Sequence, residues 1–159
     1  MRALELDPGR AETNMALAKI YGFEGRSDKA TKHAEIAAGK EPGKAFELLA
    51  QIMMDRKREG DAVSFARRSI AADPGRSMSL FILGTVARQR GQCLEALAAF
   101  QKAISAIDRA RGSVVRSLHF QTGDCLARLG REAEAEREFL AELMVLPRSV
   151  EGRVGLATL

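Results

Sequence analysis

Residues 77–108 read SMSLFILGTVARQRGQCLEALAAFQKAISAID, and the helical pattern of the chain is clearest in this segment. On either side of Gly91, apolar residues recur three and four positions apart, which is typical of amphipathic helices. Glycine adopts the left-handed conformation that ends a helix without steric cost, so Gly91 marks a turn. Gly84 and Ala96 are small, and small side chains let two helix backbones approach closely. We therefore predict two antiparallel helices, over residues 77–90 and 93–107.

The same arrangement recurs along the chain at a period close to 34 residues. Prolines follow similar segments at spacings of 34, 32 and 73 residues, and the last spacing is two periods plus five. When the prolines set the register, two positions of the repeat are always small. The later position holds Ala30, Ala62, Ala96 and Ala135, and the earlier one holds Ala18, Ala50, Gly84 and Gly123. A helix pair of this size cannot bury its apolar face alone, so each pair is expected to pack on the next.

Each repeat is expected to contribute two helices. The first helices are predicted over residues 11–24, 45–57, 77–90 and 113–129, and the second over residues 27–40, 61–72, 93–107 and 132–145. Glycine is present in three of the four turns between these helices, at Gly25, Gly91 and Gly130. Three second helices are followed by proline, which lacks a backbone donor and disfavours helical geometry in the preceding residue.

The composition agrees with packed helices. Alanine supplies 26 of the 159 residues, against 7 Val and 7 Ile, which argues against a β-rich fold. No apolar run approaches the ~18 residues that span a bilayer. Acidic residues between positions 5 and 12 interrupt any secretory signal in this segment. Cys93 and Cys125 lack metal-site spacing and are typical of buried thiols in a reducing compartment, which favours the cytoplasm while leaving the compartment open.

These residues resemble the tetratricopeptide repeat, a family with small residues at positions 8 and 20, an aromatic residue at 24, alanine at 27 and proline at 32. In residues 77–108, Gly84, Ala96, Phe100 and Ala103 match this pattern. The resemblance implies an all-α, right-handed superhelical α-solenoid of stacked antiparallel helix pairs, forming a single domain over residues 1–159. It divides into the end of a preceding repeat (1–10), four repeats (11–42, 43–76, 77–115 with an insertion, and 116–149) and the start of a further helix (150–159). We expect a fragment of a longer array.

Three departures from the family pattern stand out. Lys57 occupies a turn position where glycine is usual, and the cations around it suit the negative end of a helix dipole. Asp108 replaces the proline of the third repeat, and the five extra residues that follow are expected to lengthen the second helix or the next first helix. Glu142 replaces a small packing residue, so we expect a wetter surface there.

The resemblance implies that the first helices line a concave groove that holds a partner. The positions that face this groove in the family correspond here to Met15, Lys19, Glu47, Gln51, Phe81, Thr85, Arg88, Phe120, Asp124 and Arg128. Phe81 and Phe120 either form an exposed apolar strip with polar edges or pack between neighbouring first helices as core. Met15 fits a gap-filling core role better than a binding role. The family's carboxylate clamp for acidic chaperone tails is absent, because Met15 and Lys19 stand where the clamp has Lys and Asn.

No pattern of catalytic, cofactor or metal chemistry is found in the sequence. His33 and His119 have no nucleophile or metal ligand at a useful spacing, and His119 is expected to be a partly buried structural residue. Phosphate-binding glycine loops, paired CxxC motifs and HExxH helices are missing. We therefore predict no enzyme activity, no cofactor and no metal.

Three functions are weighed for the chain. The leading one is a non-enzymatic scaffold that binds a peptide or helix of a partner protein in the groove. The alternative is an accessory or assembly module of a larger enzyme or secretion complex, whose open ends stack or self-associate into a homo-oligomer. Nucleic-acid binding is less favoured: residues 56–116 carry 12 basic against 5 acidic side chains, but these cations scatter over both helices without aromatic stacking platforms. The identity of the partner stays open.

Overall fold

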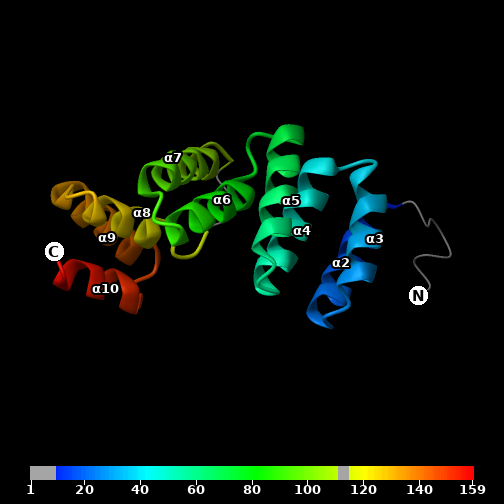
Figure 1. The fold of residues 1–159 in the computed structure, drawn as a ribbon, viewed down its shortest axis with the longest axis horizontal. Coiled ribbons are helices and arrows are strands. Elements are labelled where there is room, and N and C mark those ends of the chain that lie inside the picture. The colour runs from blue at the N-terminus through cyan, green and yellow to red at the C-terminus, as the bar shows by residue number, and fades with distance from the viewer. Residues whose placement is uncertain (1–9, 111–114) are drawn as a thin grey trace. The chain divides into compact units, whose positions relative to one another are not determined.

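The computed structural model describes residues 10–110 and 115–159, and these contain α-helices and no β-strand. The predicted all-α class is therefore confirmed. In the described residues the helices are labelled α2 to α10 in chain order (Figure 1). Their bounds are α2 Ala11–Phe23, α3 Ser27–Ala38, α4 Pro42–Asp55, α5 Glu59–Ala72, α6 Ser77–Gln89, α7 Cys93–Ala110, α8 Leu118–Arg128, α9 Glu132–Val145 and α10 Val150–Ala157.

The chain forms two compact units, Met1–Ile82 and Leu83–Leu159, here called the N-terminal unit and the C-terminal unit. In the N-terminal unit, α2 packs against α3 and α4, and α4 packs against α3 and α5. In the C-terminal unit, α8 packs against α7, α9 and α10, and α9 packs against α10. Each unit is thus built from consecutive helices that pack in pairs, with each pair stacked on the next.

The small residues of the repeat lie where the paired helices cross. Ala30, Ala62, Ala96 and Ala135 are all fully buried, as predicted. Two combinations of residues occur at these crossings. In the first repeat both helices contribute alanine, Ala18 and Ala34, whereas in the fourth Gly123 faces the ring of Phe139. A Cβ atom on Gly123 would lie 2.6 Å from that ring, so the second combination requires glycine. The repeat therefore keeps the summed volume at the crossing small.

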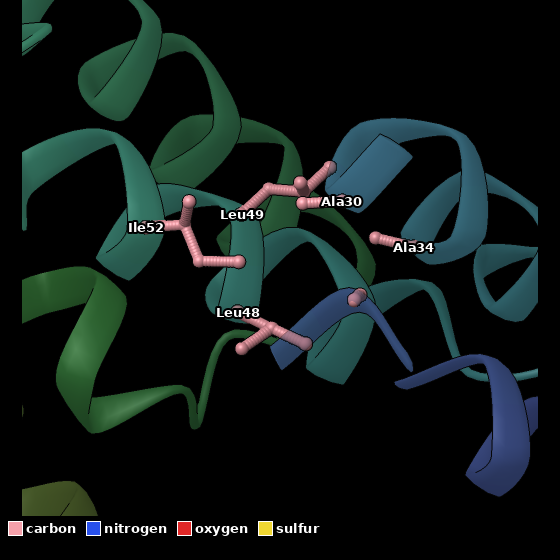
Figure 2. Close-up of a cluster of buried hydrophobic side chains, with 6 residues drawn as sticks. Ala30, Ala34, Leu48, Leu49 and Ile52 are labelled. Atoms are coloured by element: carbon pink, nitrogen blue, oxygen red, sulfur yellow. The ribbon is translucent and has the colours of Figure 1, made fainter. Parts of the chain in front are cut away.

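The core of the N-terminal unit is formed by large residues of α4 and small residues of α3. Figure 2 shows Leu48, Leu49 and Ile52 around Ala30 and Ala34, and all five are buried. Burying one such leucine or isoleucine contributes about 1.5–3 kcal/mol. The alanines add little apolar area themselves, but they allow the branched side chains to reach across the helix pair.

The turns within the repeats share one backbone conformation. Gly25, Gly91 and Gly130 have φ of 78°, 76° and 72°, as the turn pattern predicts. Lys57 takes the same conformation at φ 58°, although it has a side chain. Before two of the prolines the chain leaves the helical conformation, at the extended Asp73 and at Leu146, where α5 and α9 end.

Several helix boundaries differ from the prediction. Helix α4 begins at Pro42 rather than residue 45. Proline fits the first turn of a helix because backbone N–H groups there have no intrahelical acceptor, so the lack of an N–H costs nothing. Helix α8 was expected from residue 113 but begins at Leu118, after the left-handed Ser117. Residues 111–114 lie outside the described part of the chain. Helix α7 extends to Ala110 and is the longest described helix at 18 residues, which confirms a lengthened second helix in the third repeat.

None of the helices in the described residues is long and apolar enough to cross a membrane.

Candidate functional site

A hollowed surface runs between the first helices of the first two repeats, α2 and α4. It consists of two adjoining hollows of about 420 and 440 Å³ that share three lining residues, Lys19, Leu48 and Gln51. We call this surface the α2–α4 furrow. From α2 it is lined by Glu12, Met15, Ala16, Lys19, Gly22 and Phe23, from α4 by Lys44, Glu47, Leu48, Gln51, Ile52 and Asp55, and from nearby turns by Arg56 and Arg76.

Four of the groove residues predicted from the sequence line this furrow: Met15, Lys19, Glu47 and Gln51. Met15 is half-buried and also packs against the core of the N-terminal unit, as its gap-filling interpretation suggested. Lys19 is exposed and Gln51 is half-buried. The sequence register therefore brings residues 32 positions apart to one surface.

Glu47 is the most buried polar residue of the furrow, at 9% exposure. Its carboxylate accepts hydrogen bonds from the Arg76 guanidinium and from the backbone N–H of Ser79, the latter at 3.2 Å. The Ser79 hydroxyl in turn donates to Ser69 at 2.8 Å. Glu47 thus ties the first turn of α6 to α4, and its carboxylate belongs to the wall of the furrow.

Arg56, at the end of the furrow near Phe23, also has its hydrogen-bond partners within the chain. The Arg56 guanidinium donates to the carbonyl oxygens of Gly22 at 2.5 Å and Phe23 at 3.1 Å. It thereby adds side-chain donors to the carbonyls at the end of α2, where Gly22 also accepts the Gly25 N–H at 3.1 Å. By contrast, Lys19 and Asp55 receive no ion pair or hydrogen bond through their side chains from any described residue, and both are exposed. They are the charges that a partner would meet.

Phe23 is the most exposed of the furrow residues that the sequence did not predict. Its side chain is 92% exposed, the highest value among the exposed large hydrophobic residues in the described part of the chain. Aromatic side chains are enriched among the residues that dominate binding energy at protein interfaces. The repeat register does place Phe23 with the groove positions. It lies five residues after Ala18, at the repeat position that Asp55 and Arg128 occupy in later repeats.

In the C-terminal unit, four further predicted residues meet in a hydrogen-bonded network between α6 and α8. The Asp124 carboxylate accepts from Arg88 at 2.7 Å and pairs with Arg128 at 3.1 Å. Gln121 accepts from the Thr85 hydroxyl at 3.0 Å and from Arg88 at 3.3 Å. The bond to Asp124 raises the pKa of the Arg128 guanidinium. These groups satisfy one another, so this surface is polar but largely self-paired.

The two phenylalanines of the predicted strip are both half-buried. Phe120 packs against the buried Phe139 with ring centroids 5.9 Å apart, which favours its alternative role as a core wedge. Phe81 falls in the N-terminal unit and Phe120 in the C-terminal unit. A continuous strip through both residues therefore stays a prediction.

Glu142, where a wetter surface was expected, is itself only 2% exposed. Its carboxylate accepts hydrogen bonds from the backbone N–H of Phe120 at 3.3 Å and from the Ser149 hydroxyl at 3.4 Å. It borders a third hollow, of about 490 Å³, between the ends of α8, α9 and α10, lined by Arg116, Ser117, Glu142, Leu146, Pro147, Arg148, Ser149 and Glu151. Glu142 connects these helix ends through a buried acceptor.

The histidine side chains and Cys125, the candidate reactive groups, contact neighbouring polar side chains. His33 Nδ1 lies 2.9 Å from the buried Asn14 amide oxygen, and His119 Nδ1 lies 2.8 Å from Glu138, which confirms the partly buried structural role of His119. Burial, with a contribution from Lys32 and Lys29, lowers the pKa of His33. Burial and a hydrogen bond with Cys93 raise the pKa of Cys125 to about 12, which keeps it a neutral thiol. In the described residues no group of three or more His, Cys, Asp or Glu could hold a metal ion.

Comparison with solved structures places the fold among known helical repeat proteins. The chain matches MamA over 99% of its length and 86% of that chain, with a TM-score of 0.67 and 21% identity. It matches YrrB, described as a TPR protein with an unusual peptide-binding site, over 99% and 79%, with a TM-score of 0.66 and 19% identity. For PilW, a type IV pilus biogenesis factor, the coverage is 97% and 70%, the TM-score 0.70 and the identity 20%.

Sequence comparison gives the family. No curated protein sequence matches the chain. The tetratricopeptide repeat profile matches residues 15–77 and 81–145, which span the four predicted repeats and most of the chain. The buried alanines, the glycine turns and the paired helices described above are the features on which that pattern depends. The chain belongs to the tetratricopeptide repeat family.

Proposed function

We propose that this protein is a non-enzymatic scaffold that binds a segment of a partner protein in the α2–α4 furrow. The observation that carries the proposal is the furrow itself, an apolar hollow with unpaired charges on its rim and an exposed phenylalanine at one end. Apolar surface rimmed by polar groups is typical of protein interaction sites. The furrow also joins the positions that face the ligand groove in the family to which the chain belongs.

The state of the reactive side chains supports a binding role over a catalytic one. A thiol with a pKa near 12 is a poor nucleophile at neutral pH, and Cys125 is fully buried. His33 and His119 are held by Asn14 and Glu138 rather than aimed at a hollow. The solved structures support the same role, since YrrB is described as having a peptide-binding site.

We place the first contact with the partner in the N-terminal unit rather than at the predicted residues of the C-terminal unit. Asp124 is already paired with Arg88 and Arg128, so a partner would have to break these bonds to use it. Lys19 and Asp55 require no such rearrangement. The predicted residues of the C-terminal unit, Thr85, Arg88, Phe120, Asp124 and Arg128, are proposed as a secondary contact, and Phe81 of the N-terminal unit as a separate one.

Affinity capture with matched variants tests the proposal. Phe23→Ala removes a 92% exposed aromatic side chain from the furrow, and Met144→Ala removes an 84% exposed apolar side chain on α9, outside it. We expect Phe23→Ala to abolish capture of the partner proteins that the wild type retains, and Met144→Ala to leave it intact. Equal capture by all three proteins, with unchanged helicity, would show that the furrow is not the binding site.

Self-association is a second candidate, favoured by one observation. The last two helices expose several apolar side chains, among them Met144 at 84%, Val150 at 66% and Val154 at 54%. Burying these side chains between copies would remove apolar area from water. Light scattering of the wild type and of Met144→Lys with Val150→Lys tests this: we expect a larger mass for the wild type that falls to the monomer in the variant. A wild-type monomer at high concentration would exclude it.

A further inference from the structure

The charged groups of the α2–α4 furrow that have no partner within the chain indicate what kind of partner segment fits it. This inference rests on the proposed function. Glu47 is held by Arg76, Arg56 by two carbonyl oxygens, and Lys44 lies 3.1 Å from Glu41. These charges serve the chain's own structure. Glu12 on the α2 side is paired with Arg10 at 3.4 Å. The charges left free among the described residues of the furrow are Lys19 on the α2 side and Asp55 on the α4 side, so the free charges of the two walls are opposite in sign.

The floor between these walls is apolar and offers nothing to an extended backbone. It is formed by Gly22, Leu48 and Ile52, all buried in α2 and α4, and the Gly22 carbonyl already accepts hydrogen bonds from Gly25 and Arg56. An extended segment leaves its own backbone groups unpaired on such a surface, and each buried unpaired group costs free energy. A helix satisfies its backbone by itself and needs only an apolar face.

The length of the furrow sets the length of the occupant. It extends along α2 from Glu12 to Phe23 and along α4 from Lys44 to Asp55. Eleven helical steps at 1.5 Å each span about 16 Å, which equals about three turns of a docked helix. Such a helix contacts a groove through apolar residues at i, i+4 and i+7.

We propose that the furrow binds an amphipathic helix of about three turns from a partner protein, with acidic residues along the edge facing Lys19 and basic residues along the edge facing Asp55. Its apolar stripe lies on Leu48 and Ile52, and its end contacts Phe23. The opposite charges of the two walls give the helix one preferred rotational setting. They also select against segments with a single sign of charge on both edges.

A displayed library of random peptides of about 14 residues, long enough for three turns and two caps, tests this on the whole chain. Selection on the wild type is expected to yield helical sequences with an apolar stripe, acidic on one edge and basic on the other. The double variant Lys19→Glu with Asp55→Lys is expected to select the opposite order of charge. It should also weaken the wild-type consensus peptide about tenfold, the effect of reversing two rim charges. A charge-reversed peptide should recover this loss.

The control is the double variant Lys32→Glu with Glu35→Lys, which reverses two exposed charges on α3 outside the furrow. It is expected to select the same peptides as the wild type. Peptides that bind the furrow, are lost with Phe23→Ala, but show no charge order or no helical period would overturn the inference while leaving the proposed function intact. A library from which the wild type selects nothing would overturn both.

Discussion

Replacing Gly123 with alanine probes the packing rule on which the repeat depends. A Cβ atom at this position would lie 2.6, 2.7 and 3.1 Å from three carbons of the Phe139 ring, where carbon atoms normally approach to about 3.5–4.0 Å. The ring has no room to retreat, because Phe139 is 2% exposed and a Cβ on Gly155 would also lie 2.6 Å from it. One added methyl group must therefore move α8 away from α9.

The expected size of the effect follows from two opposing contributions. Overpacking a dense core costs about 1–3 kcal/mol, whereas glycine to alanine within a helix gains about 1 kcal/mol. We therefore expect Gly123→Ala to lower the free energy of unfolding by up to about 2 kcal/mol, and not to raise it. The matched control is Gly60→Ala in α5, where an added Cβ meets no atom within 4 Å. There the same substitution is expected to stabilise by about 0.5–1 kcal/mol.

Urea unfolding followed by far-UV circular dichroism measures both variants. Phe139→Leu removes the ring edge, so Gly123→Ala should cost less in that background than in the wild type, a coupling that a double-mutant cycle isolates. If Gly123→Ala stabilised the protein as much as Gly60→Ala, the close approach of α8 and α9 would not be needed for stability. The explanation of the small residues would then be wrong.

Three further predictions concern single side chains. Lys57→Gly relieves a left-handed non-glycine residue and should raise the free energy of unfolding by about 1 kcal/mol in the same urea assay; a loss of stability would contradict the strain. Glu142→Ala should lower it by about 1–3 kcal/mol because the N–H of Phe120 and the Ser149 hydroxyl lose a buried acceptor, and an unchanged midpoint would refute that role. The native pKa of His33 is lowered below 6.5, so the folded state binds its proton less readily than the unfolded state. Stability should therefore fall as pH drops below about 7 toward the native pKa, and His33→Gln should flatten the profile between pH 7.5 and 5.5, values about one unit either side of that ordinary pKa.

The helix pairs and their packing could be predicted because they depend on local, repeated signals. Alanine at one position and a small residue twelve positions earlier appear in every repeat, and both types are buried at the crossings. Glycine at Gly25, Gly91 and Gly130 marked the turns correctly. Lys57 showed that the turn conformation survives without glycine, which the dipole argument alone did not reveal.

The site was harder to predict, because exposure and pairing depend on neighbours from other repeats. The register placed Glu47 in the groove, but only the packing of Arg76 and Ser79 shows that its carboxylate is used within the chain. Glu142 likewise stood where the family has a small packing residue, and its hydrogen bonds come from α8 and from the residue before α10. Phe23 follows the groove register but required the structure to reveal its exposure.

Methyl NMR of the whole chain, titrated with a peptide selected from the library, tests the central claim that the α2–α4 furrow receives the partner. With labelled Ile, Leu and Met methyl groups, we expect the largest shift changes at Met15, Leu48 and Ile52, which line the furrow. Methyl groups on α9, such as those of Leu140 and Met144, should stay in place. Saturating binding with unchanged chemical shifts for these three furrow residues would show that the peptide binds outside the furrow.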